Sequence, residues 1–342
     1  MQKTLFIIDD SDTNLAMAEE ALEEHYRVMT LPSATKMLAL LEKVTPDLIL
    51  LDIEMPDMDG FEALQRLKSN PAHTDIPVIF LTSMTDAAVE VKGFQLGVVD
   101  FITKPFSAPV LLNRIKTHLD IDEIIRDRLE HIHKLQNGII FVFADMVENR
   151  DENTGGHVER TSLYIRLMMD AMMEQKVYFD EIKDMDLELF SLSARLHDVG
   201  KIAIPDSILN KPGKLTDEEF NRMKMHAMEG EKVITKMVTR TEDVEFLRHA
   251  KLFAGSHHER WDGAGYPNGL AGTNIPIQGR VMALVDVYDA LVSERPYKKP
   301  FAEDEAVNII LEGSGSQFDP TLMSVFISIK DQFTIVKSKF PD

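Results

Sequence analysis

The stretch LILLDIEMPDMDG, residues 48–60, decides the fold of the N-terminal part of the chain. Its apolar run, Leu48–Leu51, leads directly into Asp52, and an acidic loop follows that ends in Gly60. A short apolar run bounded by loop residues is typical of a buried strand. Asp52 is therefore expected at the carboxyl end of a strand.

Comparable runs precede and follow this one. The predicted strands are Thr4–Ile8, Arg27–Leu31, Leu48–Leu51, Val78–Leu81 and Val98–Ile102. Helical patterns such as Asn14–Glu24 and Phe61–Leu67 separate them. Strands that alternate with helices indicate βαβ units with right-handed crossovers. We expect an α/β domain over residues 1–122, with a doubly wound, five-stranded parallel sheet.

Polar side chains stand where these strands end. They are Asp9, Asp10, Asp52, Thr82 and Lys104. In a parallel sheet such residues meet at one edge, where ligands gather. Three neighbouring carboxylates repel one another and imply a hard divalent cation, Mg²⁺. Because a carboxylate can accept a phosphoryl group, the central aspartate is the candidate acceptor, with the lysine and the hydroxyl holding its oxygens.

Four segments carry a resemblance to a known family: IIDD (7–10), LLDIEMPDMDG (50–60), LTS (81–83) and DFITKPF (100–106). Together they resemble the receiver domain of bacterial two-component response regulators, which has a flavodoxin-like fold. The resemblance implies that Asp52 is the phosphoacceptor and that Asp9, Asp10 and Asp52 bind Mg²⁺. It also implies that Thr82 and Lys104 contact the phosphoryl group and that a sensor histidine kinase is the partner. It makes Phe101 a rotating switch residue, with a plain core position as the alternative.

A connector follows the first domain. Residues from Ala108 to about Asn137 have a helical pattern, and glycine and proline are absent from Leu111 to Gln136. We expect the last helix of the first domain to continue as a connector over residues 123–138. Its apolar stripe is either the seam of a homodimer or the face of an ordinary exposed helix, and the charged stretch Arg126–Glu130 counts against a long coiled coil.

The rest of the chain, residues 139–342, is expected to be an all-α domain, since helical periods dominate there. The predicted helices are Ile139–Val147, Thr161–Met173, Asp186–His197, Asp217–Val238, Phe246–Phe253 and Arg280–Leu291. Loop signals such as Pro212-Gly213 and Ile275-Pro276 separate them.

Five histidines and two aspartates in this half are candidate metal ligands: His157, His197, Asp198, His226, His257, His258 and Asp286. Imidazole and carboxylate hold metals such as iron, manganese or zinc. A structural zinc needs only four ligands, and the adjacent pairs 197–198 and 257–258 are expected to point in different directions. The set therefore predicts two metals, which at about 3.5–4 Å apart can clamp a phosphodiester.

The surroundings of these residues resemble the HD-GYP branch of the HD phosphohydrolases. The segments are TGGH (154–157), HDVGKIAIP (197–205), HHERWDGAGYPNGL (257–270), RPYK (295–298) and FDP (318–320). The resemblance implies hydrolysis of cyclic di-GMP to pGpG, GMP or both. It also implies that the seven residues bind two metals, iron or manganese first, with zinc, nickel or cobalt as alternatives.

Further residues have expected roles, some from the resemblance and some from their positions. Arg295 and Lys298 are expected to contact phosphate, the alternative being a solvated basic turn. Lys201 is expected to join His197-Asp198 in catalysis, on the same face if the helix continues. Tyr266 either binds the substrate by stacking on a guanine or packs the loop. Asn153 stands where some members have a third-metal glutamate, so we expect two metals.

Composition limits the partners. Cysteine is absent, which fits a reducing compartment, and no apolar run reaches the roughly 18 residues of a membrane span. A net charge of −20 argues against long DNA or RNA. We expect a cytoplasmic enzyme with a small anionic substrate. Two alternatives remain: a phosphodiesterase for 3′,3′-cyclic GMP-AMP, and a non-catalytic cyclic-dinucleotide receptor.

Overall fold

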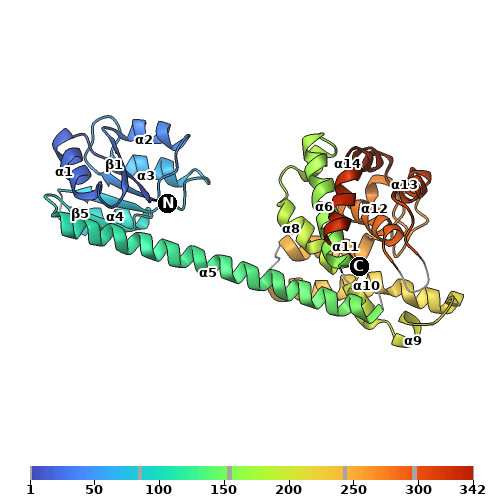
Figure 1. Cartoon of the computed structure of the whole chain (residues 1–342). Coiled ribbons are helices and arrows are strands. Elements are labelled where there is room, and N and C mark those ends of the chain that lie inside the picture. Colours follow the sequence, from blue (N-terminus) through green and yellow to red (C-terminus); the bar gives the residue numbers. More distant parts are fainter. Residues whose placement is uncertain (1, 84–86, 152–155, 242–244, 295–298, 342) are drawn as a thin grey trace. The chain divides into compact units, whose positions relative to one another are not determined.

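The computed structural model describes residues 2–83, 87–151, 156–241, 245–294 and 299–341. By its internal contacts the chain divides into two compact units, Met1–Ile132 and His133–Asp342 (Figure 1). The first unit alternates strands and helices: β1 (Thr4–Ile8), α1 (Asp12–Leu22), β2 (Arg27–Leu31), α2 (Ala34–Leu41), β3 (Leu48–Asp52), α3 (Gly60–Lys68), β4 (Val78–Thr82), α4 (Ala87–Gln95) and β5 (Asp100–Thr103).

The predicted sheet is confirmed. All five strands are parallel, in the order β2-β1-β3-β4-β5. The chain therefore winds outward in both directions from the neighbours β1 and β3, where doubly wound sheets bind their ligands. Ile8 pairs with Leu51 at the end of this ladder, so that the next residues, Asp9 and Asp52, meet at the same edge.

Both faces of the sheet are covered. Side chains of β1, β3 and β4 alternate between one core under α2 and α3 and another under α1 and α5 (Ala108–Glu148). Every residue of β3 and β4 is buried. Burial on both faces explains why these strands have continuous apolar runs instead of alternating patterns.

Helix α5 is continuous over 41 residues. Its start packs on the sheet through Leu111, Ile115 and Leu119, and its end packs in the second unit through Ala144 and Val147. Gly138 does not interrupt it, so the expected connector and the expected helix Ile139–Val147 belong to one element.

The second unit is helical, as predicted, and its described residues contain no strand. Its helices are α6 (His157–Glu174), α7 (Phe179–Ile182), α8 (Leu187–Ser193), α9 (Asp206–Leu209), α10 (Asp217–Thr241), α11 (Glu245–Ser256), α12 (Ile277–Val292), α13 (Glu303–Glu312) and α14 (Pro320–Lys339), with 3₁₀ turns η1 (Asn149–Asp151), η2 (Ala194–Leu196), η3 (Val199–Ala203) and η4 (Gly272–Asn274). Helices α13 and α14 were not among the predicted ones. No described helix has the length and hydropathy needed to cross a bilayer.

Two apolar cores support this unit. In the larger one α6, α12 and α14 meet around Tyr164, Tyr288 and Phe333, where the rings of Tyr164 and Phe333 stack at 4.4 Å. The smaller core joins the end of α5 to α10 and α11. The candidate metal ligands extend from these packed helices, which hold them in place.

Turn η3 lies directly against α10, and Gly200 permits this approach. A Cβ atom at Gly200 would overlap the carbonyl oxygen of His226 and the amide nitrogen of Gly230. The close contact holds the backbone of His226 beside the loop that begins at Asp198.

We expect Gly200→Ala to destabilise the second unit by about 1–3 kcal/mol, because two backbones must separate to admit the methyl group. Thermal unfolding followed by circular dichroism measures this. The control is Ile202→Ala in the same turn, whose side chain is exposed. Equal unfolding temperatures for the two variants would contradict the tight contact.

Candidate metal centre and phosphoacceptor site

The seven candidate ligands come from five places in the second unit. His157 begins α6, His197 and Asp198 lie between η2 and η3, His226 is on α10, His257 and His258 follow α11, and Asp286 is on α12. His157, His197, His226 and His257 are buried. Residues separated by up to 129 positions are thus brought to one interior site by helix packing.

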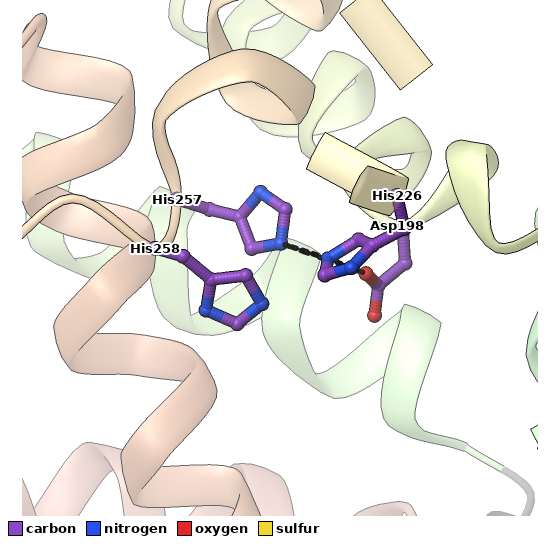
Figure 2. Close-up of side chains that lie close together, drawn as sticks. All are labelled: Asp198, His226, His257 and His258. Carbon is purple, nitrogen blue, oxygen red and sulfur yellow. Dashed lines mark hydrogen bonds and ion pairs between the residues drawn. The ribbon is translucent and has the colours of Figure 1, made fainter. Parts of the chain in front are cut away.

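The ligand atoms form two groups, within each of which they lie within 4.8 Å of one another: Asp198, His226, His257 and His258 in one, and His157, His197 and Asp286 in the other. Figure 2 shows the first group, with His257 directed at His226 and Asp198. The adjacent residues 197 and 198 fall in different groups, as expected. The adjacent residues His257 and His258 fall in the same group, which differs from the expectation.

Asp198 lies between the two groups. Its Oδ2 is 3.3 Å from Nε2 of His197, while its Oδ1 is 3.3 Å from Nε2 of His226. Nε2 of His257 is 3.5 Å from the same Oδ1. A single carboxylate thus faces both groups and could bridge two cations.

The backbone sets the tautomers of the histidines. Nδ1 of His197, His226 and His257 lies 2.9, 2.8 and 3.0 Å from the carbonyl oxygens of Ala194, Met223 and Phe253. Because a carbonyl only accepts, each Nδ1 carries a proton, and Nε2 is the ring atom left to bind a cation. The Nε2 atoms of His226 and His257 face each other at 3.2 Å, an arrangement suited to a shared cation.

Burial keeps part of the first group neutral. It lowers the pKa of His226 to about 4. The pKa of His258 also falls well below its usual value, through burial and then through the neighbouring His257 and His226. Burial opposes the charge on Asp198, but Lys201 and His197 outweigh it and lower its pKa. Neutral imidazoles and an ionised carboxylate are the forms that bind metals.

Carboxylates surround the two histidines of the second group. Burial lowers the pKa of His157, but the hydrogen bond to Asp289 and the charge of Glu148 outweigh burial and raise that pKa to about 9. Burial also lowers the pKa of His197, but the charge of Asp198 outweighs burial and raises that pKa. The negative field that would hold a proton on these rings equally favours a metal cation in its place.

Two buried atoms test whether the residues fit metals. Nε2 of His197 and Oδ1 of Asp198 make no hydrogen bond within the described part of the chain. Leaving a buried polar atom unsatisfied costs roughly 1–3 kcal/mol. A cation at each group would satisfy both atoms, so the donor set fits a pair of divalent metals.

Lys201 reaches the site by a different route from the expected one. The helix ends before it, and the chain passes through η2 and η3 instead. Its Nζ nevertheless lies 2.9 Å from Asp198 and 3.4 Å from Glu148. The lysine is buried between two carboxylates at the edge of the first group.

Glu148 and Asp289 are site residues that the sequence analysis did not assign. Glu148 is buried on the inward face of α5, one residue after Val147. Asp289 accepts hydrogen bonds from Nδ1 of His157 at 2.8 Å and from the buried Arg160 at 2.7 Å. Its spacing of three residues from Asp286 on one helix was the available signal.

An open pocket adjoins the centre. It has a volume of about 360 Å³, and its lining includes Phe220, Lys224, His258, Tyr266, Asp286 and Gln317. The Tyr266 ring lies 4.7 Å from that of His258. Nζ of Lys224 is 5.9 Å from the centroid of the Tyr266 ring. The pocket thus offers an aromatic wall and a cation beside the metal ligands.

The loop that carries Tyr266 is held by carboxylates. Glu259 is buried and accepts hydrogen bonds from the backbone of Asn268 and Leu270 at 2.7 and 2.9 Å. Asp262 accepts from the amide of Ala264 at 2.9 Å, so it orders the loop backbone. Arg295, Lys298 and Asn153, for which roles were also predicted, lie outside the described residues.

The receiver-like site lies at the carboxyl edge of the sheet. Carboxylate oxygens of Asp9, Asp10 and Asp52 lie within 4.8 Å of one another. Nζ of Lys104 is 2.6 Å from Asp9 and 2.7 Å from Asp52. Burial raises the pKa of Asp52 despite this lysine. The three carboxylates repel one another, and a divalent cation bound between them would offset this repulsion. The set therefore fits Mg²⁺.

Thr82 and Phe101 end the neighbouring strands. Thr82 is buried at the end of β4. Phe101 on β5 is also buried, with ring centroids 5.6 Å from Phe80 and 5.1 Å from Phe94. A Cβ at Gly93 would meet its ring at 2.5 Å. The inward position of Phe101 therefore depends on that glycine.

We expect Asp289→Asn to weaken Mn²⁺ binding roughly 10- to 100-fold, because His157 loses the carboxylate that orients its ring and raises its basicity. Competition against a chromophoric chelator measures the affinity. The control is Asp170→Asn, which removes an exposed ion pair with Arg166. Unchanged Mn²⁺ affinity in a folded Asp289→Asn protein would show that Asp289 does not support the centre.

Comparisons with known proteins agree with this geometry. A family model described as HD domain matches residues 141–322, and one described as response regulator receiver domain matches residues 5–116. A protein of Vibrio cholerae named probable cyclic di-GMP phosphodiesterase is 40% identical over 100% of this chain and 81% of its own length. The cyclic di-GMP phosphodiesterase response regulator RpfG of Xanthomonas campestris is 32% identical over 98% of this chain and 90% of its own.

Another Vibrio cholerae protein, named 3'3'-cGAMP-specific phosphodiesterase 2, is 36% identical over 60% of this chain and 37% of its own length. The Vibrio cholerae protein of 40% identity and RpfG each match nearly the whole chain, and so both its sheet part and its helical part. The chain belongs to the HD phosphohydrolases of the HD-GYP type, as a two-component response regulator with an N-terminal receiver domain.

Proposed function

We propose that this protein hydrolyses cyclic di-GMP to pGpG, GMP or both, under the control of phosphorylation at Asp52. The observation that carries the proposal is the pair of ligand groups joined by Asp198 beside an open pocket. The names of relatives that match nearly the whole chain support this substrate. Residues 1–122 would receive the signal, 123–138 connect, and 139–342 carry out the hydrolysis.

The metals would be held by the two groups: His157, His197 and Asp286 for one, and Asp198, His226, His257 and His258 for the other. Iron or manganese suits these donors best, and zinc, nickel or cobalt could also bind. When bound, such a pair supplies Lewis-acid activation of the phosphodiester and of water. Mg²⁺ would be held by Asp9, Asp10 and Asp52.

The chain's own side chains would position the substrate. Lys201, which lies beside Asp198 and Glu148, would stabilise negative charge that develops on the phosphate. In the pocket Tyr266 offers a flat face for a guanine, and its burial raises its pKa, which keeps the phenol neutral. Lys224 adds a cation on the same wall. Arg295 and Lys298 remain the proposed phosphate contacts.

The receiver would couple to a sensor histidine kinase through Asp52. In the structure Lys104 bridges Asp9 and Asp52. A phosphoryl group on Asp52 would replace that carboxylate charge with a bulkier dianion and require Lys104 and Thr82 to rearrange. Such a local change in charge is how receivers bias two states.

Activity is tested in an anaerobic assay with Mn²⁺ or Fe²⁺, with cyclic di-GMP and 3′,3′-cyclic GMP-AMP supplied separately and products resolved by chromatography. We expect faster turnover of cyclic di-GMP. The double variant His197→Ala/Asp198→Ala should lose at least about 10³-fold in kcat, because it removes a ligand from each group. The exposed Asp180→Ala serves as the control.

The alternatives give different results in the same assay. Preferential turnover of cyclic GMP-AMP would replace the substrate but keep the reaction. Binding of either dinucleotide without products, in protein shown to contain metal, would instead identify a receptor and overturn the proposed reaction.

Phosphorylation control is tested with Asp52→Asn. We expect the variant to keep its metals and basal turnover and to lose its response to acetyl phosphate, since the acceptor oxygen is gone. Glu54→Gln, an exposed change two residues away, is the matched control. A response to acetyl phosphate that persists in Asp52→Asn would refute this regulation.

A further inference from the structure

Helix α5 has an apolar face that its own chain leaves exposed. Seven side chains, between 47% and 65% exposed, form what we call the α5 stripe: Ile121, Ile125, Ile132, Leu135, Ile139, Val142 and Met146. Single exposed apolar residues are ordinary, but a row of this kind along one helix face marks an interaction surface.

The spacing of the stripe is that of a coiled coil. With Arg128 included, its residues follow at alternating intervals of four and three. In heptad notation Ile125, Ile132 and Ile139 occupy a positions, and Leu135 occupies a d position. At about 100° per residue, all members fall within a band roughly 100° wide. The d positions hold Ile121, Arg128, Leu135 and Val142, so the apolar a/d pattern identifies a coiled-coil seam without setting its direction.

The opposite face of α5 already has partners. Leu111, Ile115 and Leu119 pack in the core of the first unit, and Ala144 packs in the second. The inward residues therefore account for the attachment of the helix to each unit. The stripe is not needed for either core.

Gly138 supplies a second observation. A hollow of about 490 Å³ surrounds it, lined by Leu135, Ile139, Val142 and Phe143 among others. Within the described part of the chain nothing lies within 4 Å of a Cβ built there. Glycine inside a helix costs about 1 kcal/mol relative to alanine, and no contact within one chain requires it.

A second copy of the helix accounts for this glycine. In the repeat Gly138 is at g and Phe143 at e, and in a parallel pair a g residue lies beside the e residue five positions further along the partner. The exposed ring of Phe143 would fill the hollow at Gly138 of the other helix, and the reverse contact follows by symmetry. The surface is complementary to itself.

We propose that the α5 stripe is the seam of a parallel, in-register coiled coil between two copies of this chain. From Ile121 to Met146 the seam is about 39 Å long, at about 1.5 Å per residue. Arg128 is its one charged position, and Ile124 and Leu129, both exposed, flank that layer at g and e. A single polar layer of this kind costs stability but restricts the register.

Sedimentation of the full chain over a range of concentrations tests the dimer. Ile132→Glu should weaken dimerisation at least tenfold, because it buries a charge in the seam. His133→Glu places the same charge on the same turn but off the stripe, and it should leave the dimer intact. A wild-type chain that stays monomeric, or equal effects of the two variants, would overturn the proposal.

Cysteine cross-linking tests the direction, since the chain has no cysteine of its own. Ile125→Cys and Val142→Cys should each form a disulfide with an identical chain, whereas the control His133→Cys should not. In an antiparallel pair, only a mixture of the first two variants would cross-link. That result, or equal cross-linking of the control, would overturn the parallel seam.

Gly138→Leu tests the hollow. The side chain has open space within one chain, so helix content should be retained, while the dissociation constant of the dimer should rise at least tenfold. An unchanged dimer would show that Phe143 does not enter at Gly138.

Discussion

Ionised side chains can be buried together only where each faces an opposite charge, a hydrogen-bond donor or a cation, and Asp198 meets this constraint at the centre of the second unit. Its two oxygens face histidines of different groups, and Lys201 lies beside it. The backbone around Asp198 is arranged so that these side chains can reach it. The chain leaves its helical path around His197-Asp198, and Gly200 lets the next turn approach α10 closely enough to hold His226 in place.

The receiver site also contains buried carboxylates that need an opposite charge, but with fewer side chains. Lys104 lies between Asp9 and Asp52 in the way that Lys201 lies between Asp198 and Glu148. In each site the single positive charge of the lysine does not neutralise all the carboxylates around it. The remaining negative charge favours binding of a metal cation. The parallel sheet places the first set at adjacent strand ends, while the second set depends on the packing of several helices.

Helix α5 belongs to both units and uses different faces for different partners. Its inward residues change from one core to the other along its length, while the outward stripe continues through both. The two patterns can coexist because the heptad seam and the packed face lie on opposite sides of the helix. The packing of the inward face does not require a glycine at position 138. The proposed contact on the outward face does explain it.

The sequence alone was sufficient for the sheet and for proposing the seven candidate ligands, which the structure brings together in two groups. Apolar runs such as Leu48–Leu51 are local signals, and parallel winding then places Asp9 and Asp52 at one edge. Tertiary structure alone decided the grouping: His257 and His258 face the same side of Asp198, whereas His197 faces the other. Tertiary structure also placed Glu148 beside Lys201 and Asp289 beside His157. A buried carboxylate acquires its role from the charges packed against it, and those come from helices that are distant in sequence.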